Sequence, residues 1–362
     1  MHSTDMITTS KQRKKKTGEL TLVAILLAGC VVSCDRKQDA PRQERVLTVV
    51  SYGGGAYRDS QEAAFLKPFS IITGDKVESV VWNADYGKLK TMVASGRVPW
   101  DVVEVTEAQV LRGQKDGLLV PLSLLPEKTN FASGTVTAFG AGNIFWATVM
   151  TYNRAQYRSV KPTTWSDFWD VKTFPGARAL YDDPRGNLEI ALLADGVTRD
   201  KMYPLDVDRA FRRLDQLRAH VKVWWKDSSE PIQLLSNGTV TLASAWNGRV
   251  FSANKTGGDF GMSWEGAVLE LNWWVIPRGS RNVDLASRFV YFASLPSFLA
   301  EQAALVGYGP ANLAALKFVP ESVAPFLPTY PNNLNRSLKI DSGWWSENEE
   351  NMKTRWLQWK NQ

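Results

Sequence analysis

A rhythm of strands and helices that occurs twice is the feature that most limits how this chain can fold. The segments 46–52, 76–82 and 100–105 have the apolar character of strands, and helical periodicity fills 56–72 and 86–94 between them. The rhythm restarts after about residue 151, with strands expected at 177–183, 221–225 and 240–246. Such alternation implies mainly parallel sheets flanked by helices. The sequence therefore predicts an α/β fold of two lobes with a cleft between them.

The first 45 residues read as an export leader followed by a tether. Basic residues at 11–16 precede the apolar run LTLVAILLAGC, which is too short to span a bilayer and ends in the small-residue pattern of a bacterial lipoprotein box. We expect residues 1–29 to be a signal peptide and Cys30 to be lipidated, with Cys34 as the alternative. Residues 36–45 are polar, and 30–45 are expected to form a tether. The predicted location is the periplasm, or the extracytoplasmic face, with a membrane anchor.

Charge and histidine content argue against nucleic-acid binding and most enzyme chemistry. The formal charge of +6 becomes +3 from Cys30 onward, because residues 1–29 carry five basic and two acidic side chains, and no basic cluster is present. The chain has two His, one of them in the leader, and it lacks P-loop, HExxH and GxSxG patterns. A carboxylate-dependent glycoside hydrolase is the remaining enzymatic alternative. We expect no enzyme, no metal and no cofactor.

The carboxyl ends of the predicted strands carry aromatic and acidic residues. Ligands of open parallel sheets bind at these ends. They hold Glu104, the pair Asp182 and Asp183, the pair Trp224 and Trp225, and Trp246, while the segment ELNWWVIP adds Glu270 and Asn272. Aromatic faces mixed with a few carboxylates suit an organic cation.

Several motifs resemble those of the periplasmic spermidine/putrescine-binding proteins of ABC importers. They are SYGGGAYRD from residue 51, TTWSDFW from 163 with YDDPR behind it, SAWNGR from 244 and VGYGPANLAAL from 306. The resemblance covers nearly all of 46–345. It implies two α/β lobes that close on a solute, and an ABC permease as partner. We expect a monomer with lobe 1 at 46–148 plus 276–308, and lobe 2 at 149–275 plus 309–362.

The resemblance also implies ligand residues, with departures that leave the ligand open. It places an ammonium-binding carboxylate at Asp183 and cleft aromatics at Tyr57, Trp246 and Tyr308. Two further carboxylates of the polyamine pattern are replaced here by Gly186 and Asn272. A polyamine or related small amine is the first expectation. Its alternative is an amino-acid-like zwitterion such as γ-aminobutyrate, held by Asp183 and by Arg185 or Arg249. The predicted ligand-binding set is Tyr57, Glu104, Asp183, Arg185, Trp225, Trp246, Arg249, Glu270, Asn272 and Tyr308.

Structural roles are the alternative for several of these residues. Asp183 precedes Pro184 and a helical pattern, so it is a good N-cap, a role compatible with ligand contact. Trp246 could belong to the core, and Glu104 could be a solvated strand end. Trp224 and Trp225 face opposite ways in a strand, so at most one of them is expected in the cleft.

Overall fold

One mixed sheet organises the described part of the chain. The computed structural model describes residues 45–362, so the predicted signal peptide, most of the tether and both cysteines lie outside the described residues. The main strands follow one another across the sheet in the order β2-β1-β3-β10-β6-β9-β7-β8. In chain order they are β1 (Val46–Tyr52), β2 (Lys76–Trp82), β3 (Val102–Thr106), β6 (Gly140–Asn153), β7 (Arg178–Tyr181), β8 (Val221–Trp225), β9 (Leu242–Trp246) and β10 (Phe260–Pro277).

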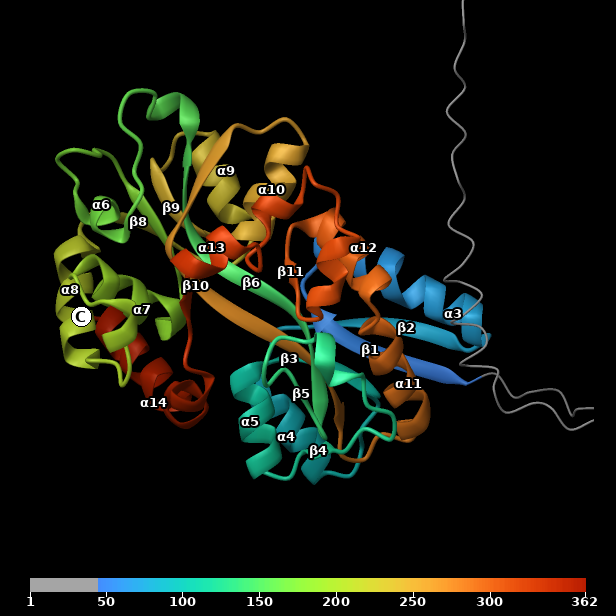
Figure 1. Cartoon of the computed structure of the whole chain (residues 1–362). Coiled ribbons are helices and arrows are strands. Elements are labelled where there is room, and N and C mark those ends of the chain that lie inside the picture. Colours follow the sequence, from blue (N-terminus) through green and yellow to red (C-terminus); the bar gives the residue numbers. More distant parts are fainter. Residues whose placement is uncertain (1–44) are drawn as a thin grey trace, which may run out of the picture. The chain divides into compact units, whose positions relative to one another are not determined.

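Both ends of this sheet have the parallel pairing that the sequence predicts. Strand β1 pairs in parallel with β2 and β3, and β7 pairs in parallel with β8 and β9. The middle differs, because β6 and β10 run antiparallel to each other and to their outer neighbours β9 and β3. Short strands β4 (Leu119–Val120), β5 (Val136–Thr137), β11 (Gly309–Pro310) and β12 (Leu338–Lys339) add to this centre. The sheet thus has two parallel halves with antiparallel strands between them (Figure 1).

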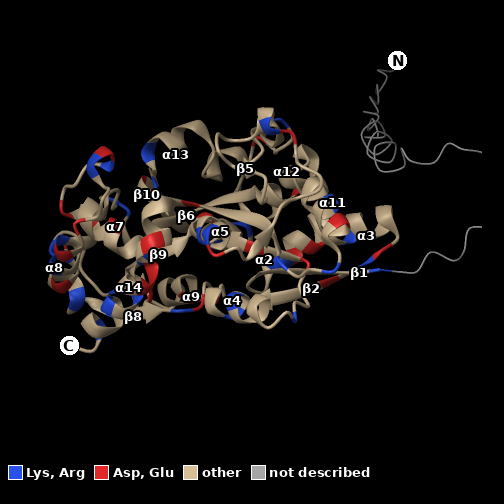
Figure 2. Ribbon diagram, turned by 90° about the horizontal axis from the view of Figure 1, so that it is seen from below, with Lys and Arg blue, Asp and Glu red and all other residues tan. Residues whose placement is uncertain are grey.

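Helices follow the strands of each half. After β1 to β3 come α2 (Ala56–Gln61) and α3 (Lys67–Thr73), joined by a π-helical turn, then α4 (Tyr86–Ala94) and α5 (Glu107–Lys115). Between β6 and β10 come α6 (Trp165–Trp169), α7 (Pro184–Ala194), α8 (Val207–Arg218), α9 (Glu230–Ser236) and α10 (Asn247–Lys255). After β10 come α11 (Val283–Ala293), α12 (Pro296–Val306), α13 (Pro331–Arg336) and α14 (Ser342–Lys360), of which α12 packs on α2. Helix α8 carries four Arg and two Asp, so basic side chains predominate on it (Figure 2).

No single helix within residues 45–362 has the length and apolarity of a membrane span; α11 and α12 meet that test only when taken together across a 67° bend.

Strands β6 and β10 are the longest in the described sheet and set the position of its centre. Their register places Glu270 opposite Trp146 and Trp273 opposite Gly142, with irregularities on either side of the 268–271 segment. Nearly every residue of both strands is buried. The polar side chains of these strands, among them Asn272, therefore lie in the interior of the fold.

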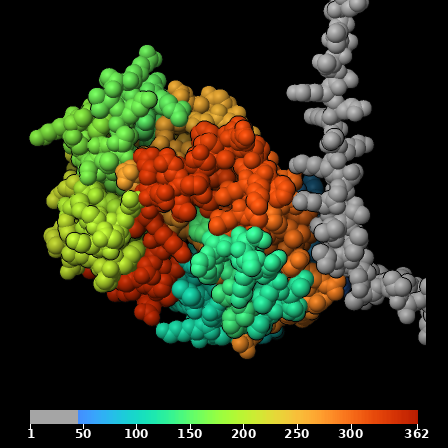
Figure 3. All heavy atoms as spheres, in the orientation of Figure 1, coloured from blue at the N-terminus to red at the C-terminus, as the bar shows by residue number. Residues whose placement is uncertain are grey.

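Helix α14 packs its tryptophans onto the half of the sheet that contains β7 and β8. Trp345, Trp356 and Trp359 are buried, and Trp224 of β8 contacts the last two edge to face. Asp182, directly after β7, accepts hydrogen bonds from Trp356 Nε1 at 3.0 Å and Lys360 Nζ at 2.6 Å. In Figure 3 this red segment lies between the yellow-green and teal parts of the chain, in agreement with its contacts to α7 and α5. Asp182 therefore holds helix α14 against this half of the sheet.

We predict that Asp182→Asn lowers the free energy of unfolding at pH 7 by about 2 kcal/mol, because a buried charge-assisted pair is lost. Although burial opposes it, bonding to Lys360 and Trp356 holds the pKa of Asp182 below its ordinary value. Its contribution is thus present above about pH 4 and lost as the pH falls through the folded-state pKa. Urea unfolding tests this, with Asp259→Asn as control: Asp259 pairs with Arg154 at the surface and should matter little. Equal losses in both variants would contradict the prediction.

Candidate functional site

A cavity of about 470 Å³ lies where the strand ends of both halves meet the two central strands. Its walls come from the ends of β1, β3, β7 and β9, from β6 and β10, and from helix α14. The lining residues are Tyr52, Gly53, Tyr57, Trp82, Asn83, Ala84, Thr106, Gln109, Ile144, Trp146, Thr148, Tyr181, Asp183, Arg185, Lys226, Asp227, Ser228, Trp246, Arg249, Glu270, Asn272, Tyr308, Glu349 and Lys353. A volume of this size is typical of small-molecule sites.

Eight of the ten residues expected in the ligand site line this cavity. Glu104 and Trp225 do not, and both side chains are fully buried behind its wall. Trp225 instead packs on Tyr181, with ring centroids 4.5 Å apart, and on Trp246 at 5.6 Å. Trp225 thus supports two aromatic rings that do face the cavity.

Glu104 is the centre of a buried hydrogen-bond network that positions cavity residues. It accepts hydrogen bonds from Tyr57 Oη at 2.5 Å, Gln61 Nε2 at 3.0 Å, Asn143 Nδ2 at 3.0 Å and Asn272 Nδ2 at 3.3 Å. Burial raises the pKa of Glu104, while these four donors oppose the shift. The donors come from α2, β6 and β10, which enclose the side chain, so this strand end is not solvated. Its role is to orient Tyr57 and Asn272.

Asp183 begins helix α7 and also lines the cavity. Its Oδ1 accepts a hydrogen bond from the Arg185 backbone N–H at 2.9 Å, so the expected N-cap is confirmed. The helix is interrupted at once, since Arg185 is extended and Gly186 has φ of 84°, a conformation that favours glycine. Burial raises the pKa of Asp183 to about 6, although nearby Lys353 opposes the shift. The cavity therefore holds a carboxylate that lacks a salt-bridge partner among the described residues.

Arg185 and Glu270 neutralise each other. Arg185 Nη2 lies 2.5 Å from Glu270 Oε2, and the two side chains are only 10% and 5% exposed. Arg185 Nη1 also donates to Thr106 Oγ1 at 3.4 Å, which links the end of β7 to the end of β3. Burial raises the pKa of Glu270 and the Arg185 charge opposes that shift. Breaking this pair would leave a buried charge unpaired, so neither group is free for a ligand.

Arg249, on α10, is the opposite case. Within residues 45–362 its guanidinium has no ion pair and no hydrogen bond, and its Nε is buried without a partner, although its charge acts on the exposed Asp227, which Ser229 binds. Its Nη2 would lie 3.8 Å from a Cβ placed on Gly53, so the guanidinium faces the Gly-rich turn after β1. Burial raises the pKa of Tyr308, and the Arg249 charge opposes that shift, so the pKa stands at about 12. An unpaired guanidinium in a cavity favours a carboxylate ligand.

Aromatic rings form the walls around these charges. Trp246 contacts Trp146 and Tyr181 edge to face, with centroids 5.4 Å and 5.8 Å apart, and Tyr52 stacks on Trp82 at 6.1 Å. Trp146 is held by a hydrogen bond from its Nε1 to Asn272 Oδ1 at 2.9 Å. Such walls suit an aliphatic chain with a charged group at each end.

Helix α14 contributes to the cavity, which was not predicted from the sequence. Glu349 and Lys353 both line it, and they form an ion pair at 2.8 Å. A signal was present, because Glu349 follows Trp345 by four residues and precedes Met352 by three. It therefore lies on the buried apolar stripe of the helix. A charged residue within such a stripe indicates a polar partner in the interior.

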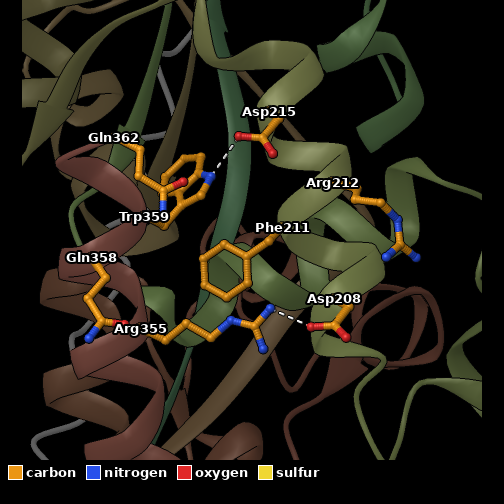
Figure 4. A pocket seen from close by; sticks show the side chains of 8 residues that line it. All are labelled: Asp208, Phe211, Arg212, Asp215, Arg355, Gln358, Trp359 and Gln362. Carbon is orange, nitrogen blue, oxygen red and sulfur yellow. Dashed lines mark hydrogen bonds and ion pairs between the residues drawn. The ribbon is translucent and has the colours of Figure 1, made fainter.

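A second hollow lies between α8 and the end of α14 (Figure 4). Its acidic groups are already engaged: Asp208 pairs with Arg355, and Asp215 accepts from Trp359 Nε1 at 2.7 Å. The guanidinium of Arg212 in this hollow has no ion pair among residues 45–362, but it is exposed to solvent, whereas Nε of Arg249 is buried.

The fold and the cavity together define a class, the α/β binding proteins that enclose a small ligand between two halves. The pattern of the bacterial extracellular solute-binding proteins matches residues 73–329. This chain belongs to that family.

Three known proteins place it more closely. A γ-aminobutyric acid-binding protein of Pseudomonas aeruginosa is 36% identical over 327 residues, which cover 88% of this chain and 92% of the relative. A spermidine/putrescine-binding periplasmic protein of Escherichia coli is 26% identical and covers 74% of this chain and 79% of the relative. An ABC transporter substrate-binding protein of Bradyrhizobium japonicum has a TM-score of 0.83 at 34% identity, covering 87% of this chain and 99% of the other. The expected resemblance and fold class are confirmed.

We predict that Asp183→Asn stabilises the unliganded protein by about 1 kcal/mol at pH 8. Asparagine keeps the N-cap, and the cost of a buried unpaired carboxylate disappears. Since the pKa of Asp183 is higher in the folded state, the advantage of the variant grows as the pH rises through about 6 and vanishes below about 4. Urea unfolding at pH 8 and below pH 4 measures the difference in the free energy of unfolding. A variant less stable than the wild type at pH 8 would show that the carboxylate has a hidden partner.

Proposed function

We propose that this protein is the substrate-binding component of an ABC importer and captures an amino-acid-like zwitterion of the γ-aminobutyrate type. The single observation that carries the ligand class is the contrast between paired and unpaired charges in the cavity. Asp183 is left for an ammonium and Arg249 for a carboxylate, while Arg185 with Glu270 and Lys353 with Glu349 neutralise each other. The aromatic walls receive the methylene chain. The γ-aminobutyric acid-binding relative, at 36% identity, supports this ligand class.

A polyamine is the second candidate. Four carboxylates line the cavity, namely Asp183, Asp227, Glu270 and Glu349, which favours a polycation at first sight. Two of them already have internal cationic partners, and the exposed Asp227 accepts hydrogen bonds from Ser229. A diamine would also bring an ammonium toward Arg249. The site therefore supports a zwitterion better.

Binding without chemistry completes the proposal. Ligand would bridge the two halves, shift the protein toward a closed form and present it to a membrane permease. A lipid on Cys30, or on Cys34, would hold it at the extracytoplasmic face of the membrane. Incorporation of radiolabelled palmitate into wild type, Cys30→Ala and Cys34→Ala assigns the anchor; label retained in both variants would reject a single lipidated cysteine.

We predict that Arg249→Gln weakens binding of γ-aminobutyrate by about 100-fold and leaves n-butylamine unchanged, because only the first ligand has a carboxylate. Asp183→Asn should weaken both. Calorimetric titration of residues 36–362 measures these affinities, with Arg154→Gln, which removes a surface guanidinium, as control. Tight binding of putrescine without binding of γ-aminobutyrate would replace the zwitterion with a polyamine.

We also predict that binding near pH 6 releases protons. The ammonium of the ligand stabilises ionised Asp183 and so lowers the pKa, which stands near 6 in the unliganded protein. Titrations in two buffers with different ionisation enthalpies measure the number released, which should fall toward zero at pH 8 and in Asp183→Asn. Proton uptake, or identical release in the variant, would assign the ammonium to another group.

A further inference from the structure

Helix α14 brings an internal ammonium to the part of the cavity that contains Asp183. Lys353 and Glu349 lie one turn apart on this helix, pair at 2.8 Å and both line the cavity. The Lys353 charge acts on Asp183, and Glu349 acts on Asp183, Arg185 and Glu270. The five side chains thus share one end of the cavity. None of the other contacts described above depends on this pair.

Contacts on two sides hold this helix in place. Asp182 binds Trp356 and Lys360 on the β7 side. On the α5 side, Arg112 pairs with Glu350 at 2.8 Å and Ser342 Oγ donates to Glu107 at 2.8 Å. Glu349 and Lys353 are therefore presented from a fixed helix, as a selective site requires.

Counting charges shows what Lys353 does. Asp183, Glu270 and Glu349 provide three carboxylates at this end, against the two cations Arg185 and Lys353. When all five are ionised, these five residues leave one negative charge at this end, which a single ammonium balances. Without Lys353 the remaining four would leave two negative charges there, which suits a second cationic group.

We infer that Lys353, held by Glu349, is a specificity-determining residue that restricts the site to ligands of zero net charge. The inference rests on the proposed function and names the discriminating group. A zwitterion and a diamine both bring an ammonium to Asp183, near Lys353. They differ at the other terminus, where Lys353 attracts the carboxylate of the zwitterion and repels the second ammonium of the diamine.

The test compares γ-aminobutyrate, 5-aminovalerate and putrescine by calorimetric titration. The last two ligands carry the same number of methylene groups and differ in one terminal charge. In Lys353→Met the preference for 5-aminovalerate over putrescine should fall by about tenfold, whereas Lys353→Arg should keep it. Lys339→Met is the matched control, because Lys339 is also a half-exposed, ion-paired lysine but lies outside the cavity, beside Glu107. Lys353→Gln provides a second neutral variant if the methionine variant is unstable.

The outcomes separate the two proposals. If the wild type binds neither amino acid, the proposed function fails and this inference with it. If the wild type binds them and both neutral variants keep the original preference, only the inference about Lys353 is overturned. A parallel loss of affinity for all three ligands, with the preference unchanged, would assign Lys353 to packing and also overturn it.

Discussion

The antiparallel pairing of β6 with β10 is the constraint on which the rest of the structure depends. These strands separate the two parallel halves of the sheet, so their register decides which side chains the halves meet. It places Glu270 beside Trp146. From these positions Glu270 pairs with Arg185, and Trp146 contacts Trp246. A slip of one residue would turn these side chains to the other face of the sheet and remove the floor of the cavity.

The cavity is rich in charge, yet the protein neutralises most of that charge itself. Unpaired buried charges are costly, and internal pairing lowers the cost before any ligand arrives. The adjacent residues Asp182 and Asp183 show both outcomes. Asp182 is bonded by Lys360 and Trp356 and its pKa falls, whereas Asp183 faces the cavity without a cationic partner and its pKa rises. Ligand selectivity follows from which charges are left over, and this depends on the pairing.

Local signals in the sequence predicted much of the fold. Strands β1 and β2 and helix α4 have the expected bounds, and Asp183 caps α7 as proposed, because these features depend on neighbouring residues. Long-range packing was not predictable in the same way. The burial of Glu104 requires α2, β6 and β10 to meet around it, and the Arg185 to Glu270 contact joins residues 85 positions apart. The role of α14 in the cavity likewise depends on where a distant helix packs, although Glu349 in its apolar stripe was a usable signal.

The position of α14 links stability to recognition. The helix is held by Asp182 and by the tryptophans that pack on β8, and the same helix carries Lys353 to the end of the cavity that contains Asp183. Asp183 bears the cost of an unpaired carboxylate in the empty cavity, and only a cation can offset that cost. A Lys353 paired with Asp183 would compete with the ligand, but its ion pair is with Glu349. The cost at Asp183 is thereby retained until an ammonium from outside removes it, which makes the gain on binding specific to the ligand.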